Sequence, residues 1–127
     1  MGESKWAAER RRVRQRAWRL ANREKVVADA KLYAAEHADE RRVYSSVLRA
    51  VQLGVLVNDF DIFDWQELLV QWDNTCAYCC SRERIELEHK TPFARGGANT
   101  KSNIVPACRT CNQRKHTRTV SEFLAVA

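Results

Sequence analysis

Proline, glycine and long apolar stretches are scarce in this chain of 127 residues, which has two prolines and four glycines. No apolar run approaches the roughly 18 residues that a membrane-spanning helix needs, so we expect no membrane role. The first residues lack the apolar core of a signal peptide, and a cytoplasmic location is therefore expected. In such a reducing compartment, five cysteines indicate metal binding more than a disulfide framework.

The excess of basic over acidic residues lies entirely in the first part of the chain. Residues 1–50 hold 13 Lys/Arg against 7 Asp/Glu, a net charge of +6, whereas residues 51–127 hold nine of each. This asymmetry indicates a polyanionic partner for the first segment, and DNA is the partner we expect. The candidate DNA contacts in this segment are Arg10, Arg11, Arg12, Arg14, Arg16 and Arg19. A helix that binds a protein partner is the alternative.

Residues 1–53 are predicted to form a basic helical extension. Between residues 4 and 53 there is no proline, and Ala, Arg and Glu dominate. One apolar stripe recurs every seven residues, but its companion positions are largely polar, so a long two-stranded coiled coil is poorly supported. Residues 54–71 are predicted to be a connecting loop and a short helix, which starts at a capping box of Asp64 and Glu67.

The cysteines form two pairs with metal-ligand spacing, Cys76 with Cys79 and Cys108 with Cys111. Each two-residue gap lets a tight turn direct both sulfurs at one ion, and two such turns complete a closed, structural four-thiolate zinc site. The 28 residues between the pairs exceed the spacing of a simple zinc ribbon, so we expect a functional insert there. A redox pair and unligated core cysteines are the alternatives, and Cys80 is left over.

The insert and its flanks predict an α+β domain over residues 72–127. Residues 85–89 alternate in polarity like a strand, and residues 104–107 form a second apolar segment. A helix is expected over 111–117, and Thr119 with Glu122 is expected to cap a final helix.

The insert also carries residues suited to phosphodiester hydrolysis. His89 can accept the proton of an attacking water near neutral pH. Glu88 and Asn112 supply oxygen ligands for one Mg²⁺ or Mn²⁺ ion, which would neutralise charge on the phosphate. Because neighbouring strand residues point to opposite faces, the chain has to bend there for Glu88 and His89 to reach one phosphate.

These residues and their order resemble the HNH endonuclease family, of the zinc-stapled kind common in phages and mobile elements. The resemblance covers about residues 72–124 and rests on the two cysteine pairs, Glu88-His89, Pro92, Gly96-Gly97, Asn99, Ser102-Asn103-Ile104, Asn112 and Lys115. It implies a ββα-metal core that cuts DNA to leave 5′-phosphate and 3′-hydroxyl ends. It implies His89 as general base, Glu88 and Asn112 as ligands of the catalytic metal, and Asn103 as the residue that orients His89.

This sequence departs from the family pattern at both expected metal ligands. Glu88 replaces the more usual Asp, and Asn112 stands where many members have His, which favours an oxygen-preferring ion over catalytic zinc. Arg95, Arg114 and Lys115 are further candidate DNA contacts. The rival hypothesis is a catalytically idle zinc-knuckle module that only binds nucleic acid. Target sequence, nicking against double-strand cleavage, RNA cleavage and oligomeric state stay open.

Overall fold

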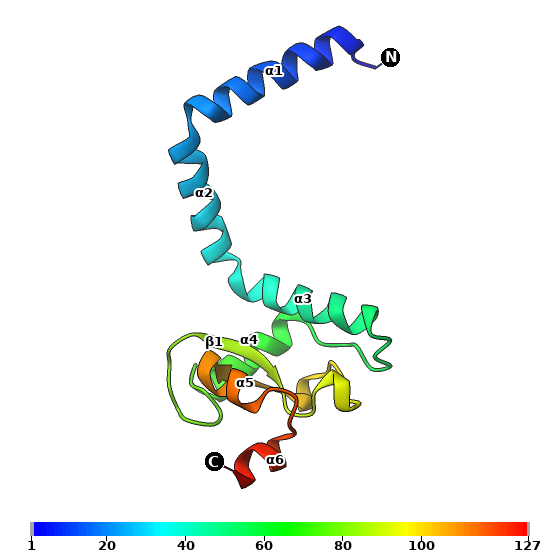
Figure 1. The fold of residues 1–127 in the computed structure, drawn as a ribbon, viewed down its shortest axis with the longest axis vertical. Coiled ribbons are helices and arrows are strands. Elements are labelled where there is room, and N and C mark those ends of the chain that lie inside the picture. Colours follow the sequence, from blue (N-terminus) through cyan, green and yellow to red (C-terminus); the bar gives the residue numbers. More distant parts are fainter. Residues whose placement is uncertain (1, 127) are drawn as a thin grey trace. The chain divides into compact units, whose positions relative to one another are not determined.

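The structure, a computed structural model, describes residues 2–126 and divides the chain into two compact units. One unit extends to residue 38 and the other begins at residue 39. The helices and strands labelled in Figure 1 are α1 (Lys5–Ala21), α2 (Arg23–Glu36), α3 (Ala38–Gln52), α4 (Ile62–Gln71), β1 (Ile85–His89), β2 (Ile104–Cys108), α5 (Arg109–Lys115) and α6 (Val120–Ala125), with two short 3₁₀ helices, η1 (Phe93–Arg95) and η2 (Lys101–Asn103). No described helix is both long and apolar enough to cross a membrane.

The first unit consists of α1 and α2, which confirms the predicted helical character of this segment. Ser4 caps α1, because its hydroxyl accepts a hydrogen bond from the Ala7 amide. The helix ends at Asn22, whose backbone and side-chain N–H groups both donate to the Trp18 carbonyl. Neither helix contains a buried residue, and the apolar stripe stays exposed at Trp6 and Val13. These helices therefore have no hydrophobic core of their own.

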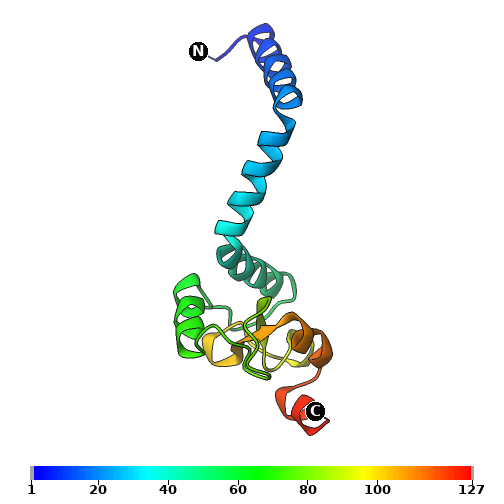
Figure 2. The same cartoon turned by 90° about the vertical axis from the view of Figure 1, so that its left-hand side faces the viewer.

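Helix α3, apart from its first residue Ala38, falls in the second compact unit, whereas the predicted basic extension runs to residue 53. Its Val43 side chain packs in one buried cluster with Trp65 of α4 and Ile104 of β2. Composition alone could not separate α3 from α1 and α2, because all three segments favour helix. In both views α3 and α6 lie on opposite sides of the hairpin (Figure 1, Figure 2).

Helix α4 starts earlier than the sequence predicted. Its capping box pairs Asp61 with Asp64: the Asp61 carboxylate accepts from the Asp64 amide at 2.9 Å, and the Asp64 carboxylate accepts from the Asp61 amide. The prediction that the box joins Asp64 to Glu67 was therefore wrong by one helical turn. Both pairs, Asp61 with Asp64 and Asp64 with Glu67, have the required three-residue spacing. The helix that begins after Asp61 buries Trp65 and Leu68, and the sequence alone does not show this burial.

The two strands pair antiparallel, with His89 opposite Ile104 and Ile85 opposite Cys108. This confirms the predicted strand pair and extends the second strand by one residue, to Cys108. Helix α5 follows β2 directly, two residues before the predicted start. The capping box of Thr119 and Glu122 begins α6 as predicted. The result is the expected α+β fold: a hairpin and a helix, with both cysteine pairs at the end of the hairpin where β1 begins and β2 ends.

Candidate metal centre and active site

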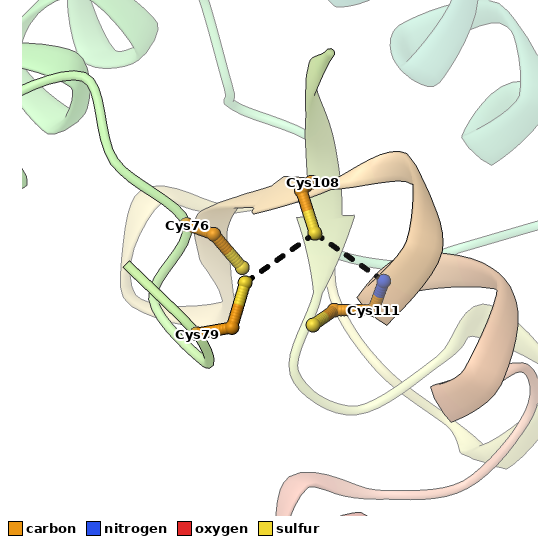
Figure 3. Close-up of side chains that lie close together, drawn as sticks. All are labelled: Cys76, Cys79, Cys108 and Cys111. Atoms are coloured by element: carbon orange, nitrogen blue, oxygen red, sulfur yellow. Dashed lines mark hydrogen bonds between the residues drawn. The ribbon is translucent and has the colours of Figure 1, made fainter. Parts of the chain in front are cut away.

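Four cysteine sulfurs converge on one point in the second unit. The Sγ atoms of Cys76, Cys79, Cys108 and Cys111 all lie within 4.8 Å of one another (Figure 3). Four sulfurs held about 2.3 Å from one zinc ion in a tetrahedron are about 3.8 Å apart, and the Cys79 and Cys108 sulfurs are 3.6 Å apart. The donor set fits zinc, and the predicted ligands are brought together. Cys80 is exposed and lies outside this set.

The environment of these sulfurs favours thiolates and a cation between them. Burial opposes ionisation of Cys76, but hydrogen bonds from backbone amides prevail and lower its pKa to about 7. The Tyr78 amide donates to Cys76 Sγ and the Cys111 amide to Cys108 Sγ, both at 3.4 Å. Burial and the neighbouring sulfurs raise the pKa of Cys111, because four thiolates cannot share this space without a positive charge. A divalent ion supplies that charge.

The predicted general base and the two predicted ligands of the catalytic metal line a single cavity of about 490 Å³, whereas Asn103 does not line it. Glu88 and His89 reach it from the end of β1, and Asn112 reaches it from α5. The Asn112 side chain makes no hydrogen bond to another residue in the part of the chain that the structure describes. Two residues that the sequence interpretation did not place there, Arg49 of α3 and His116, also line the cavity.

His89 is held between an aromatic ring and an amide. Its imidazole lies 4.3 Å from the Phe93 ring, centroid to centroid, and its Nε2 is 2.9 Å from Asn99 Oδ1. Burial lowers the pKa of His89, the hydrogen bond to Asn99 opposes this, and the positive charges of Arg49 and Lys115 add to the lowering. The imidazole is therefore neutral at pH 7 and keeps a lone pair.

Asn103 fixes the loop that follows His89. Its Oδ1 accepts from the Thr91 amide at 2.9 Å, while its Nδ2 donates to the carbonyls of Thr91 and Ala98 at 3.0 and 2.8 Å. The loop is so tight at this point that a Cβ on Gly97 would lie 1.7 Å from the Thr91 carbonyl oxygen. Only glycine fits there. These contacts agree with the orienting role that the family resemblance implies for Asn103.

Glu88 is buried in a network of its own. One carboxylate oxygen accepts from Lys115 Nζ at 2.7 Å, and the other accepts from the Tyr78 hydroxyl at 2.5 Å. Lys115 also donates to the His89 carbonyl at 2.9 Å. Burial and the hydrogen bond to Glu88 raise the pKa of Tyr78, so this phenol stays a donor. Glu88 and Lys115 are 4% and 0% exposed, so this is a buried ion pair.

The burial of Lys115 does not agree with its predicted contact to DNA. Its ammonium group has no exposed surface for a phosphate and already binds Glu88 and His89. In the sequence, Lys115 is only a positive charge near the end of a helix, a position where lysine is usually solvated. Its charge is used inside the domain, where it holds α5 to the end of β1.

The predicted DNA-contacting arginines are all exposed. The six arginines of α1 are exposed, and within residues 2–126 two of them pair with an acid: Arg11 with Glu3 and Arg12 with Glu9. Arg114 is also exposed. Arg95 is engaged by Glu122 through both guanidinium nitrogens, at 2.7 and 3.1 Å, which ties η1 to α6. A contact between Arg95 and DNA stays a prediction. The ion pair with Glu122 makes such a contact less favourable.

The sequence interpretation missed three residues around His89. Asn99 was noted only as part of the family motif, yet it is fully buried against the histidine. Asn58 accepts a hydrogen bond from the Asn99 side chain and donates one to the Val47 carbonyl. The Arg49 guanidinium lies 5.9 Å from the Phe93 ring centroid. Asn58 and Arg49 lie 31 and 40 positions before His89, so no local spacing could have identified them.

Residues 76–118 match the HNH endonuclease family, which confirms the resemblance predicted from the sequence. The match covers both cysteine pairs, the hairpin and α5, and leaves α1 to α4 outside it. It indicates a nuclease-type activity with a metal site, and nucleic acid as the partner. No curated protein matches the chain.

Proposed function

We propose, from the HNH match of residues 76–118, that this chain is a metal-dependent endonuclease that hydrolyses phosphodiester bonds of DNA. One observation carries the proposal: Glu88, His89 and Asn112 line the same cavity. A binding module needs neither a neutral histidine nor oxygen ligands beside it. Zinc is assigned to the four cysteines alone, because that closed set leaves no position for water or substrate.

His89 is proposed to be the general base. Its Nε2 is engaged by Asn99, so Nδ1 is the ring nitrogen left to accept the proton of the attacking water. The Phe93 ring on one side and the Asn99 amide on the other restrict rotation of the imidazole. Asn103 holds the same loop through three hydrogen bonds and thereby keeps Phe93 in place.

Glu88 and Asn112 are proposed to hold Mg²⁺ or Mn²⁺. An ionised carboxylate has about four acceptor positions, and Tyr78 and Lys115 use two of those on Glu88. The Asn112 amide oxygen supplies a second donor, and such oxygens suit these hard ions. When bound, the ion neutralises charge on the phosphate and the leaving oxygen. Lys115 beside Glu88 lowers the affinity for that ion and fixes the carboxylate in place.

Arginines at the cavity are proposed to bind the DNA backbone. Arg49 and Arg109 line the cavity, are exposed, and pair with no carboxylate within residues 2–126. A planar guanidinium can bind a phosphate through two N–H groups. The six arginines of α1 are proposed to add backbone contacts that do not depend on sequence. A protein partner for this helix is the alternative, which its exposed Trp6 and Trp18 favour.

The rival function is a nucleic-acid-binding module without catalysis. The engagement of both Glu88 oxygens by Tyr78 and Lys115 favours it, because a metal has to share that carboxylate. Binding alone, however, gives no reason for the cavity to hold a neutral, oriented histidine. A cleavage assay decides between the two functions.

The test incubates the purified, zinc-loaded protein with supercoiled plasmid and Mg²⁺, Mn²⁺ or Zn²⁺. We expect nicked or linear DNA with Mg²⁺ or Mn²⁺. His89→Ala is expected to lower the rate by about 10²–10⁴-fold, the usual loss for a general base, without loss of zinc or DNA affinity. The matched control is His37→Ala, because His37 lies on the first unit, where its ring hydrogen-bonds to the Tyr33 carbonyl and stacks on the Tyr33 ring. DNA binding without cleavage by the wild type would establish the rival, whereas full activity of His89→Ala would remove His89 from the mechanism.

A further inference from the structure

Three consecutive hydrogen bonds connect helix α3 to the imidazole of His89. Asn58 Nδ2 donates to the Val47 carbonyl at 3.2 Å, and Asn99 Nδ2 donates to Asn58 Oδ1 at 2.8 Å. Asn99 Oδ1 then lies 2.9 Å from His89 Nε2. We call this series of groups the amide relay.

The carbonyl of Val47 sets the direction of the whole relay. A carbonyl can only accept, so the Asn58 group facing it must be the NH₂ group. The Asn58 oxygen therefore faces Asn99, and the Asn99 NH₂ group must donate to it. This leaves Asn99 Oδ1 for His89, and an oxygen of an amide cannot donate. The Nε2 atom consequently carries the proton, and Nδ1 carries the lone pair.

The loop between α3 and α4 also fixes the backbone of Asn99. The Asn99 amide donates to the Val57 carbonyl, and its carbonyl accepts from the amides of Asp59 and Phe60, at distances of 2.9 to 3.1 Å. Asn58 and Asn99 form a parallel bridge, and Asn99 has no exposed surface. Water therefore cannot replace the Asn58 amide at Asn99. Every one of these partners lies outside the segment that matches the family.

We propose that Asn58 is a positioning residue that sets the tautomer of His89, acting through Asn99. The inference deepens the proposed function, because it assigns the nitrogen at which the general base acts. It also assigns a role in the reaction to the loop 55–61, which the family match leaves out. Asn58 does not line the cavity, and its connection to His89 runs through the Asn99 amide.

The test compares Asn58→Leu with Asn58→Asp in the zinc-loaded full chain. Leucine removes the acceptor for Asn99 Nδ2, so the Asn99 amide can turn and present N–H to His89, which selects the other tautomer. Aspartate keeps an acceptor for Asn99 Nδ2 and loses only the N–H group that donates to the Val47 carbonyl. Nitrogen NMR of protein labelled at histidine distinguishes the tautomers at about pH 8, where imidazole is neutral. We expect protonated Nε2 in the wild type and in Asn58→Asp, and loss of that state in Asn58→Leu.

Plasmid cleavage provides the second readout. The net worth of one hydrogen bond predicts a fall in kcat of about threefold to tenfold for Asn58→Leu, at unchanged KM and zinc content. Protonated Nδ1 in the wild type overturns the inference, and so does an unchanged tautomer in a folded Asn58→Leu protein. Should Asn58→Leu not fold, a reversed tautomer in Asn58→Asp overturns it too. A wild type without cleavage defeats the proposed function instead and leaves the tautomer measurement valid.

Discussion

Replacing Lys115 with methionine tests whether the buried ion pair with Glu88 holds the nuclease unit together. Methionine keeps most of the volume but removes the ammonium group, which donates to Glu88 at 2.7 Å and to the His89 carbonyl at 2.9 Å. The Glu88 carboxylate then stays buried with only the Tyr78 hydroxyl as partner. An unpaired buried charge has lost its hydration without compensation, which makes the folded state less stable.

The structure gives the size of this effect. Lys115 and Glu88 are 0% and 4% exposed, and breaking such a pair on one side costs about 3–5 kcal/mol. In a domain of fewer than 100 residues, each kcal/mol moves the melting temperature by about 4–8 °C. We therefore expect Lys115→Met to melt at least about 12 °C below the wild type. Adding Glu88→Gln removes the stranded charge and should restore part of the loss.

Thermal unfolding followed by circular dichroism, at one fixed excess of zinc, measures the shift. The matched control is Lys101→Met, which breaks an exposed ion pair with Glu67 whose side chains are 41% and 64% exposed. Exposed pairs contribute at most about 1 kcal/mol, so this control should change little. Equal melting temperatures for the two variants would refute the argument that the Glu88–Lys115 pair is structural.

Three further changes test the metal sites and the basic helix. Cys108→Ser should reduce zinc to below one ion per chain and unfold the second unit, as metal analysis and circular dichroism would show; a folded, active, zinc-free protein would contradict the assignment. Asn112→Ala should raise the Mg²⁺ concentration needed for half-maximal cleavage, and a lower maximal rate at unchanged Mg²⁺ dependence would argue against its ligand role. Changing four exposed arginines of α1 to glutamine should flatten log K against log[salt] by up to about 3.6 units, since each phosphate contact contributes about 0.9. The four positions are Arg10, Arg12, Arg14 and Arg16. An unchanged slope would direct attention to a protein partner for α1.

The sequence was most informative where spacing alone decides the structure. Two residues between paired cysteines suffice to direct both sulfurs at one ion, so all four sulfurs meet as predicted. The strand 85–89 was readable from its alternation, but its register with 104–108 was not, because the long connection over residues 90–103 does not determine it. These features depend on contacts that are close along the chain or on one shared ion.

Contacts between distant segments were not readable. Asn58 meets Asn99 across 41 positions, and nothing near either residue marks the pair. The burial of Lys115 was not readable either, because a lysine near a helix end is usually solvated. Lys115 is buried here because it pairs with the buried Glu88, which lies far from it in the sequence. Val43 shows the same limit, because its packing in one cluster with Trp65 cannot be read from its own segment.

Tyr78 connects the cysteine cluster to the cavity that holds His89. Its backbone amide bonds the sulfur of Cys76, and its hydroxyl bonds Glu88 at the cavity. Helix α5 makes a second connection, because Cys111 lies one position from Asn112. When zinc at the cysteines and a ligand at the cavity stabilise the same arrangement of Tyr78 and α5, each of them raises the affinity of the protein for the other. On the proposed function, removal of zinc is expected to weaken the arrangement of the cavity, and a bound substrate is expected to slow the loss of zinc.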